Sequence, residues 1–176
     1  MKKLLILAVA VLGVFTVSAQ KFARVDLNEI VVAMPEFEEA QKNLEAFGKD
    51  LQEQMEQIQV EFNNKLADFQ KNQATMAASI KQMKQQELEQ LQQRFGEFQQ
   101  IAQQDFQKKQ QELAAPIQEK LTAAIAKVAK AGGFTAVFDT SIPTLAYIDE
   151  AQTADLTPAV KKELGIAEAP AVAPAK

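Results

Sequence analysis

Residues 37–69 read FEEAQKNLEAFGKDLQEQMEQIQVEFNNKLADF. Apolar side chains recur in this stretch every three or four residues, with a mean step of about 3.6, which is the period of an α-helix. Gln, Glu and Lys fill the other faces, so the apolar stripe is narrow. Because a narrow stripe buries little surface alone, this helix needs a partner helix.

A second apolar stripe of the same kind runs from Leu88 to Val128. Between the two stripes, Ser79 followed by Gln82 fits a capping box, in which the serine oxygen accepts an N–H at the start of a new helix. We therefore predict an antiparallel helical hairpin, an arm over residues 36–130 with its tip near residues 74–79. The alternative is one continuous helix in a parallel coiled coil, but strand-like segments at both ends of the arm must meet.

Those segments alternate apolar and polar residues, and they lie at residues 22–26, 134–138 and 144–148. Asp26 fits the cap of a short helix that begins at Leu27, and Thr157-Pro158 fits the start of another. The predicted fold class is α+β, with a long antiparallel coiled-coil hairpin inserted in a small β-stranded body.

This body comprises residues 20–35 and 131–165. Three short strands and short helices make a poor core for one chain, so we expect the body to oligomerise.

Residues 1–19 have the layout of a secretory signal peptide, with two lysines, an apolar run and the small residues Val17-Ser18-Ala19. We expect cleavage after Ala19 and export to the periplasm, with an uncleaved anchor as the alternative. Removing these residues and their two lysines changes the net charge from −4 to −6. Residues 166–176 are rich in Ala and Pro, which predicts a disordered tail.

The composition argues against most enzyme classes. The chain has no Cys and no His, which removes thiol nucleophiles, the commonest general base and the commonest metal ligands. It has no glycine-rich phosphate loop, and its acidity argues against nucleic-acid binding. We expect no cofactor and no metal. The body carboxylates could form an acid–base pair, but their spacing fits turns and helix caps better; they are Asp26, Asp139, Asp149, Glu150 and Asp155.

The order of segments resembles the Skp/OmpH family of periplasmic chaperones. The resemblance lies in the opening strand FARVD at residues 22–26, the Gln-, Lys- and Glu-rich hairpin, and its return LAAPIQEKL at residues 113–121. It continues in FTAVFD at residues 134–139 and in DLTPAVKKEL at residues 155–164.

The resemblance implies an ATP-independent homotrimer whose arms enclose a cavity for unfolded outer-membrane protein precursors. The residues expected to form the trimer body are Phe22, Val25, Phe134, Val137, Phe138, Leu145 and Tyr147. Familiar members of the family are strongly basic, whereas this chain is acidic, so we expect at most weak contact with membrane or lipopolysaccharide. A structural or adaptor coiled-coil protein of the envelope is the alternative function.

Client contacts are expected along the arm, because holding needs many weak, adaptable contacts. The apolar candidates are Phe62, Phe69, Met76, Met83, Phe95 and Phe98. The alternative role of the four phenylalanines is the seam between the helices, which suits them better than it suits the two methionines near the tip. The tip is also locally positive, with Lys71, Lys81 and Lys84 as candidates for acidic clients or anionic lipid, or as ordinary solvated surface.

Three residues interrupt the helical pattern of the arm and are hinge candidates: Gly48, Gly96 and Pro116. Each glycine costs roughly 1 kcal/mol of helix propensity, and proline removes a helix hydrogen bond. With a tip near Ala77 the two glycines are not opposite one another. All three could also be tolerated irregularities.

Overall fold

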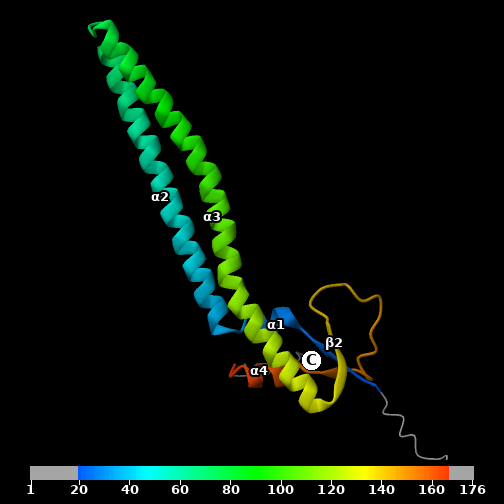
Figure 1. Ribbon diagram of the computed structural model, residues 1–176. Helices are drawn as coiled ribbons and strands as arrows, with labels where there is room; N and C mark the ends of the chain where they lie inside the picture. The colour runs from blue at the N-terminus through cyan, green and yellow to red at the C-terminus, as the bar shows by residue number, and fades with distance from the viewer. Residues whose placement is uncertain (1–19, 167–176) are drawn as a thin grey trace, which may run out of the picture. The chain divides into compact units, whose positions relative to one another are not determined.

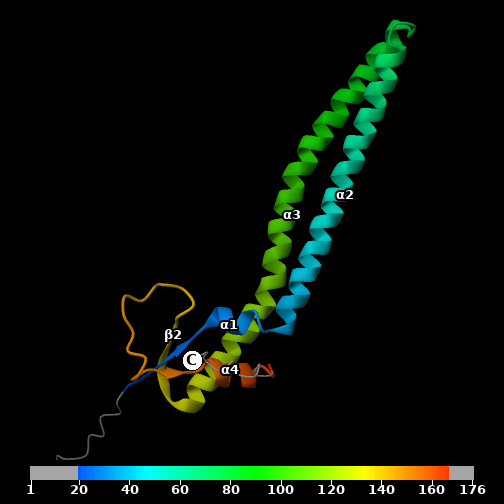
Figure 2. The same cartoon turned by 180° about the vertical axis from the view of Figure 1, so that it is seen from behind.

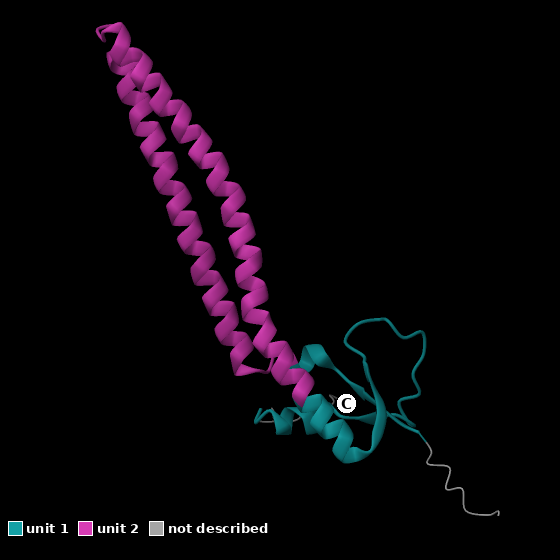
Figure 3. Cartoon of the chain, in the orientation of Figure 1, with its two compact units in different colours: residues 1–30, 124–176 teal, residues 31–123 magenta. Residues whose placement is uncertain are grey.

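The computed structural model describes residues 20–166. The predicted signal peptide and almost all of the predicted tail lie outside these residues. Within them the chain divides into two compact units, which Figure 3 colours separately. We call residues 31–123 the arm, and residues 20–30 together with 124–166 the body. The arm thus begins five residues earlier and ends seven residues earlier than the range 36–130 expected from the sequence.

The arm is an antiparallel pair of helices. Helix α2 spans Pro35–Asn72 and helix α3 spans Ala78–Gly132, and Figures 1 and 2 show the two side by side from opposite directions. At 1.5 Å per residue, α2 is roughly 57 Å long. Pro35 occupies the first turn of α2, where its missing N–H has no helical partner to lose. The helices are therefore a hairpin and not one continuous rod.

The predicted capping box at Ser79 is wrong. Helix α3 already begins at Ala78, and Lys81 N–H donates to the Ala77 carbonyl at 3.0 Å, so Ser79 lies inside the first turn. Since alanine has the highest helix propensity, Ala78 lets the helix start earlier than a serine cap would. Thr75 closes the preceding turn through its N–H and hydroxyl, both of which donate to the Asn72 carbonyl.

The body holds a three-stranded parallel sheet in the order β2-β1-β3. Strand β1 spans Lys21–Val25, β2 spans Phe134–Asp139 and β3 spans Ala154–Asp155. Helix α1 (Leu27–Val31) follows β1, and helix α4 (Thr157–Glu163) follows β3. The buried residues of the body are Ala23, Val25, Ile30, Ala124, Leu156, Thr157 and Val160.

The ends of the body helices follow the expected local chemistry. Asp26 Oδ1 accepts a hydrogen bond from Glu29 N–H at 2.9 Å and caps α1. Gly133, at φ +69°, ends α3, because this left-handed conformation costs glycine little.

The predicted strand at residues 144–148 is wrong. This segment has no regular structure in the single chain, and Tyr147 is 81% exposed. Strand β1 already pairs on both sides, with β2 and with the two-residue strand β3. An apolar alternating segment becomes a strand only when it finds an edge to pair with, and β1 offers it none.

Candidate functional site

The seam between α2 and α3 is only partly filled by side chains. Its buried residues are Ile58, Leu91, Ala102, Ile117 and Leu121, distributed along the length of the arm. Hollows lie between these contacts. One of about 280 Å3 lies near Phe37 and Ile117, and one of about 190 Å3 lies near Phe62 and Leu91. A third, of about 670 Å3, lies in the middle of the arm, and we call it the mid-arm groove.

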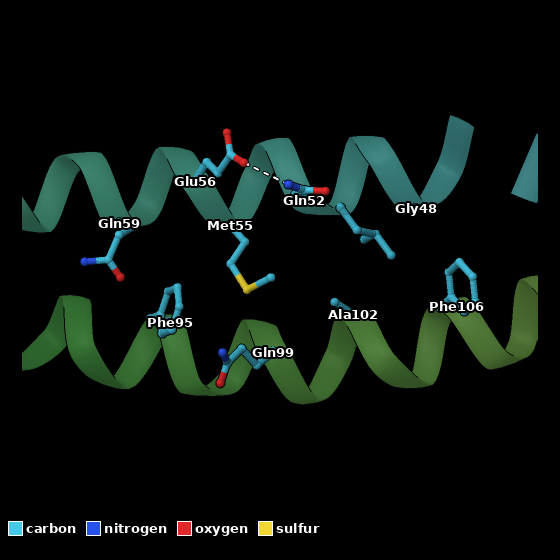
Figure 4. Close-up of a pocket in the computed structure, with 10 residues that line it drawn as sticks. Gly48, Gln52, Met55, Glu56, Gln59, Phe95, Gln99, Ala102 and Phe106 are labelled. Atoms are coloured by element: carbon cyan, nitrogen blue, oxygen red, sulfur yellow. Dashed lines mark hydrogen bonds between the residues drawn. The ribbon is translucent and has the colours of Figure 1, made fainter. Parts of the chain in front are cut away.

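Figure 4 shows the mid-arm groove, with residues of both helices facing one another across it. Its lining residues are Gly48, Leu51, Gln52, Met55, Glu56, Gln59, Phe95, Gln99, Ala102 and Phe106. Leu51, Met55 and Phe95 supply an apolar floor, and glutamine side chains surround it. Gln52 Nε2 donates to Glu56 Oε1 at 3.0 Å. The groove thus offers apolar surface together with hydrogen-bonding groups and a carboxylate.

Gly48 lies directly opposite Phe106. A Cβ added at Gly48 would stand 3.2 Å from Phe106 Cε2, whereas a Cβ at Gly96 would meet no atom within 4 Å. The sequence reasoning treated Gly48 as a hinge and did not foresee this contact. A signal was present, since Gly48 and Phe106 each lie 29 residues from Ala77 near the tip.

The helices continue through all three hinge candidates. Gly48 lies inside α2, and Gly96 and Pro116 lie inside α3. Their role as hinges stays a prediction.

The phenylalanine candidates lie along the seam. Phe62 and Phe95 line the hollows between the helices, and Phe69 and Phe98 are half-buried. Of the two methionines near the tip, Met76 is half-buried and Met83 is 52% exposed. Met83 is therefore the most accessible of these six side chains, and the role of all six in binding stays a prediction.

Among the exposed apolar residues that were not candidates, Val60, Ile80 and Ile101 lie on α2 and α3. They fall outside the helical stripes that pack into the seam. That departure from the three-or-four-residue period is the signal that would have found them.

The tip lysines differ in their surroundings. Lys84 Nζ lies 3.4 Å from Glu87 Oε2, so its charge is partly matched. Lys71 and Lys81 form no ion pair with any residue in the range 20–166. The binding role proposed for these lysines stays a prediction.

Ion pairs join the two helices at both ends of the arm. Lys65 Nζ lies 2.5 Å from Glu87 Oε1, Arg94 lies 2.7 Å from Glu61, and Lys120 contacts Glu36 near the base. The hydrogen bond from Lys65 lowers the pKa of the Glu87 carboxyl, and the one from Lys120 lowers the pKa of Glu36. The sequence analysis missed these pairs, although the two members of each pair are nearly equidistant from residue 77.

The body carboxylates are engaged in turns and caps. Asp139 Oδ1 accepts from Ser141 N–H at 2.8 Å, and Asp155 Oδ1 accepts from Thr157 N–H at 2.9 Å. Burial alone would raise the pKa of Asp155, but hydrogen bonds from the side chain and backbone of Thr157 and the charge of Arg24 outweigh it and lower that pKa. These contacts suit structural roles and not a reacting acid–base pair.

Residues 20–166 contain no cluster of three or more potential metal-ligating side chains. In the same part of the chain, no helix combines the length and the apolar character that a membrane span requires.

Residues 21–164 match the family model described as outer membrane protein (OmpH-like), which covers the hairpin and both parts of the body. The chain belongs to the OmpH-like family. It is also 28% identical to the chaperone protein Skp of Yersinia enterocolitica over 157 residues, which cover 88% of this chain and 94% of that protein. The resemblance inferred from the sequence is therefore confirmed, and the family is that of OmpH/Skp-like outer membrane chaperones.

A solved structure shares the fold. It is described as an OmpH-like outer membrane chaperone from Caulobacter crescentus CB15, and it superposes with a TM-score of 0.71 at 14% identity. The match covers 82% of this chain and 83% of that one. The predicted fold class, a helical hairpin with a small stranded body, is confirmed.

Proposed function

We propose that this chain is an ATP-independent periplasmic holdase, which assembles as a homotrimer and binds unfolded outer-membrane protein precursors between its arms. A holdase binds the unfolded client and not the folded one, so mass action suppresses aggregation without an energy source. The proposal includes no catalysis.

The observation that carries the proposal is the surface of the arm. The hollows of the seam expose apolar side chains next to glutamines, and Val60, Met83 and Ile101 stand exposed at separate places. Precursors of β-barrels alternate apolar and polar residues. Many small apolar contacts interspersed with hydrogen-bonding groups fit such a client better than one deep pocket would.

The surface of the body supports assembly. In the single chain Phe22, Leu145 and Tyr147 are exposed, and β2 lies at an edge of the sheet with one side unpaired. Exposed apolar side chains beside an open sheet edge are a liability unless another subunit covers them. A trimeric body would bury both.

The proposed location rests on the signal-peptide layout of residues 1–19 and on the family. In the periplasm a chain without cysteine depends on no disulfide.

The test is dilution of a urea-unfolded β-barrel protein into buffer containing the mature chain, followed by light scattering. Suppression of aggregation at one trimer per client, unchanged by added ATP, is the expected result. In the matched control, an equal mass of an unrelated folded helical protein replaces the mature chain. If aggregation proceeds as in the control, the holdase function is wrong and an adaptor role is favoured.

A further inference from the structure

The mid-arm groove combines an apolar floor with an excess of negative charge. The groove is bounded by residues 48–59 of α2 and 95–106 of α3. These two segments contain five carboxylates and one lysine, a net formal charge of −4; the charged residues are Lys49, Asp50, Glu53, Glu56, Glu97 and Asp105. All five carboxylate side chains are exposed to solvent, and Glu56 also lines the groove itself.

The cations near the groove all have partners within the arm. Lys49 pairs with Glu53 at 3.7 Å, and Arg94 pairs with Glu61. Lys108 pairs with Glu112 at 3.8 Å, and Lys109 lies over the ring of Phe47. Within residues 20–166, no cation forms an ion pair with Glu56, whose only side-chain partner there is the Gln52 amide. Glu56 is thus available to a cation from outside the chain.

We propose that the mid-arm groove binds extended segments of unfolded polypeptide in which Lys or Arg alternates with apolar residues. This inference rests on the proposed holdase function and specifies its client. Apolar side chains of such a segment would cover Leu51, Met55 and Phe95, and its long cationic side chains would reach the carboxylates along both helices. The occupant follows from charge complementarity, because an acidic segment would be repelled by the same five carboxylates.

The tip has the opposite charge. Residues 69–86 contain three lysines and no carboxylate. Basic segments of a client would therefore bind at the groove, and acidic segments would bind near the tip.

The probes are three fluorescent peptides of about ten residues, the length of a barrel strand, with identical apolar residues at alternate positions. The remaining positions are all Lys, all Ser or all Glu. Fluorescence anisotropy with the full mature chain should give affinities in the order Lys, Ser, Glu. The advantage of the Lys peptide should shrink as salt is raised from about 20 mM to about 150 mM, where the Debye length falls to about 8 Å.

Glu56→Gln removes the charge but keeps an oxygen that can accept from Gln52. It should weaken binding of the Lys peptide by about two- to fivefold and leave the Ser peptide unchanged. The matched control is Glu39→Gln, an equal charge change at an exposed site about 25 Å along α2. At about 150 mM salt that control should bind like wild type, because about three Debye lengths separate it from Glu56. Ala102→Leu, which fills the groove, should weaken all three peptides.

Equal affinity for the Lys and Glu peptides, or equal effects of Glu56→Gln and Glu39→Gln, would overturn the inference. So would an affinity for the Lys peptide that falls as protein concentration rises, since a second copy of the chain would then occupy the groove. Wild type is tested in parallel for suppression of barrel-protein aggregation. If suppression succeeds while peptide charge has no effect, only this inference fails; if suppression also fails, the holdase function fails with it.

Discussion

Gly48 on α2 packs against the ring of Phe106 on α3, and a Cβ at Gly48 would stand 3.2 Å from Phe106 Cε2. That distance is tighter than an ordinary contact, but Phe106 borders the open mid-arm groove and its ring has room to shift. The absence of a side chain at Gly48 thus lets the two helices approach closely at one edge of the groove.

Alanine substitutions at the two arm glycines should differ in size. Gly96→Ala should raise the free energy of unfolding by about 1 kcal/mol, because alanine has the higher helix propensity and meets no neighbouring atom. Gly48→Ala should raise the free energy of unfolding by less, because displacing Phe106 offsets part of the gain in helix propensity. Urea unfolding followed by circular dichroism measures both. Equal increases in the free energy of unfolding would mean that the Gly48–Phe106 contact is not tight. The same two variants test the hinge: an unchanged arm spread in small-angle scattering would exclude it.

Acid should weaken the arm by protonating its paired carboxylates. The pKa values of Glu36, Glu38 and Glu87 are lowered by hydrogen bonds from lysines. A carboxyl with a lowered folded-state pKa contributes stability above its unfolded pKa, near 4.3, and loses it as pH falls through the folded value. The melting temperature should therefore decrease when the pH is lowered below about 4. Glu87→Gln should reduce this dependence, whereas Glu89→Gln, an exposed neighbour without an ion pair in the described residues, should not.

The hydrogen bond between Asp26 N–H and Thr157 Oγ1, at 3.0 Å, ties β1 to α4 within the body. Thr157 is buried, so Thr157→Val would keep the shape but leave the Asp26 N–H without its acceptor. The expected loss is about 1–3 kcal/mol of unfolding free energy. Thr135→Val, at an exposed position in β2, is the control and should change stability by less than about 0.5 kcal/mol. A similar loss in both variants would count against the specific bond.

Assembly should depend on the exposed Tyr147 of the body. Tyr147→Asp should shift the mature chain from trimer toward monomer in sedimentation velocity, because a charge would be buried at the proposed interface. Ala126→Asp places the same charge at an exposed site on the part of α3 that belongs to the body. That variant should sediment as wild type. If the Tyr147→Asp variant still sediments as a trimer, the interface lies elsewhere.

The positive tip should matter for client capture at low salt. Replacing Lys71, Lys81 and Lys84 with Gln should weaken binding of an unfolded barrel protein in about 20 mM salt, and much less in about 150 mM, where surface charges are screened. The control is the same three-charge change at Lys42, Lys130 and Lys162, which are exposed and lie outside both the tip and the mid-arm groove. Unchanged affinity in the tip variant would show that its lysines are only solvated surface.

Local patterns in the chain predicted much of the fold. The helical period of residues 37–69 predicted α2, and the Asp26 cap was identified from residues close in sequence. Ser79 failed as a cap because the helix propensity of Ala78 outweighed the capping box. The strand expected at residues 144–148 failed because its partner edge is not local.

The sequence by itself determined the helical hairpin, its turn and the membership of the OmpH-like family, because helix periods, caps and motifs act over a few residues. Only the tertiary structure decided that β3 and not residues 144–148 completes the sheet. It also decided that Gly48 faces Phe106, that Lys65 pairs with Glu87, and that a groove opens in the middle of the arm. These features depend on the register of segments distant in sequence, and that register is set when side chains from both helices pack together.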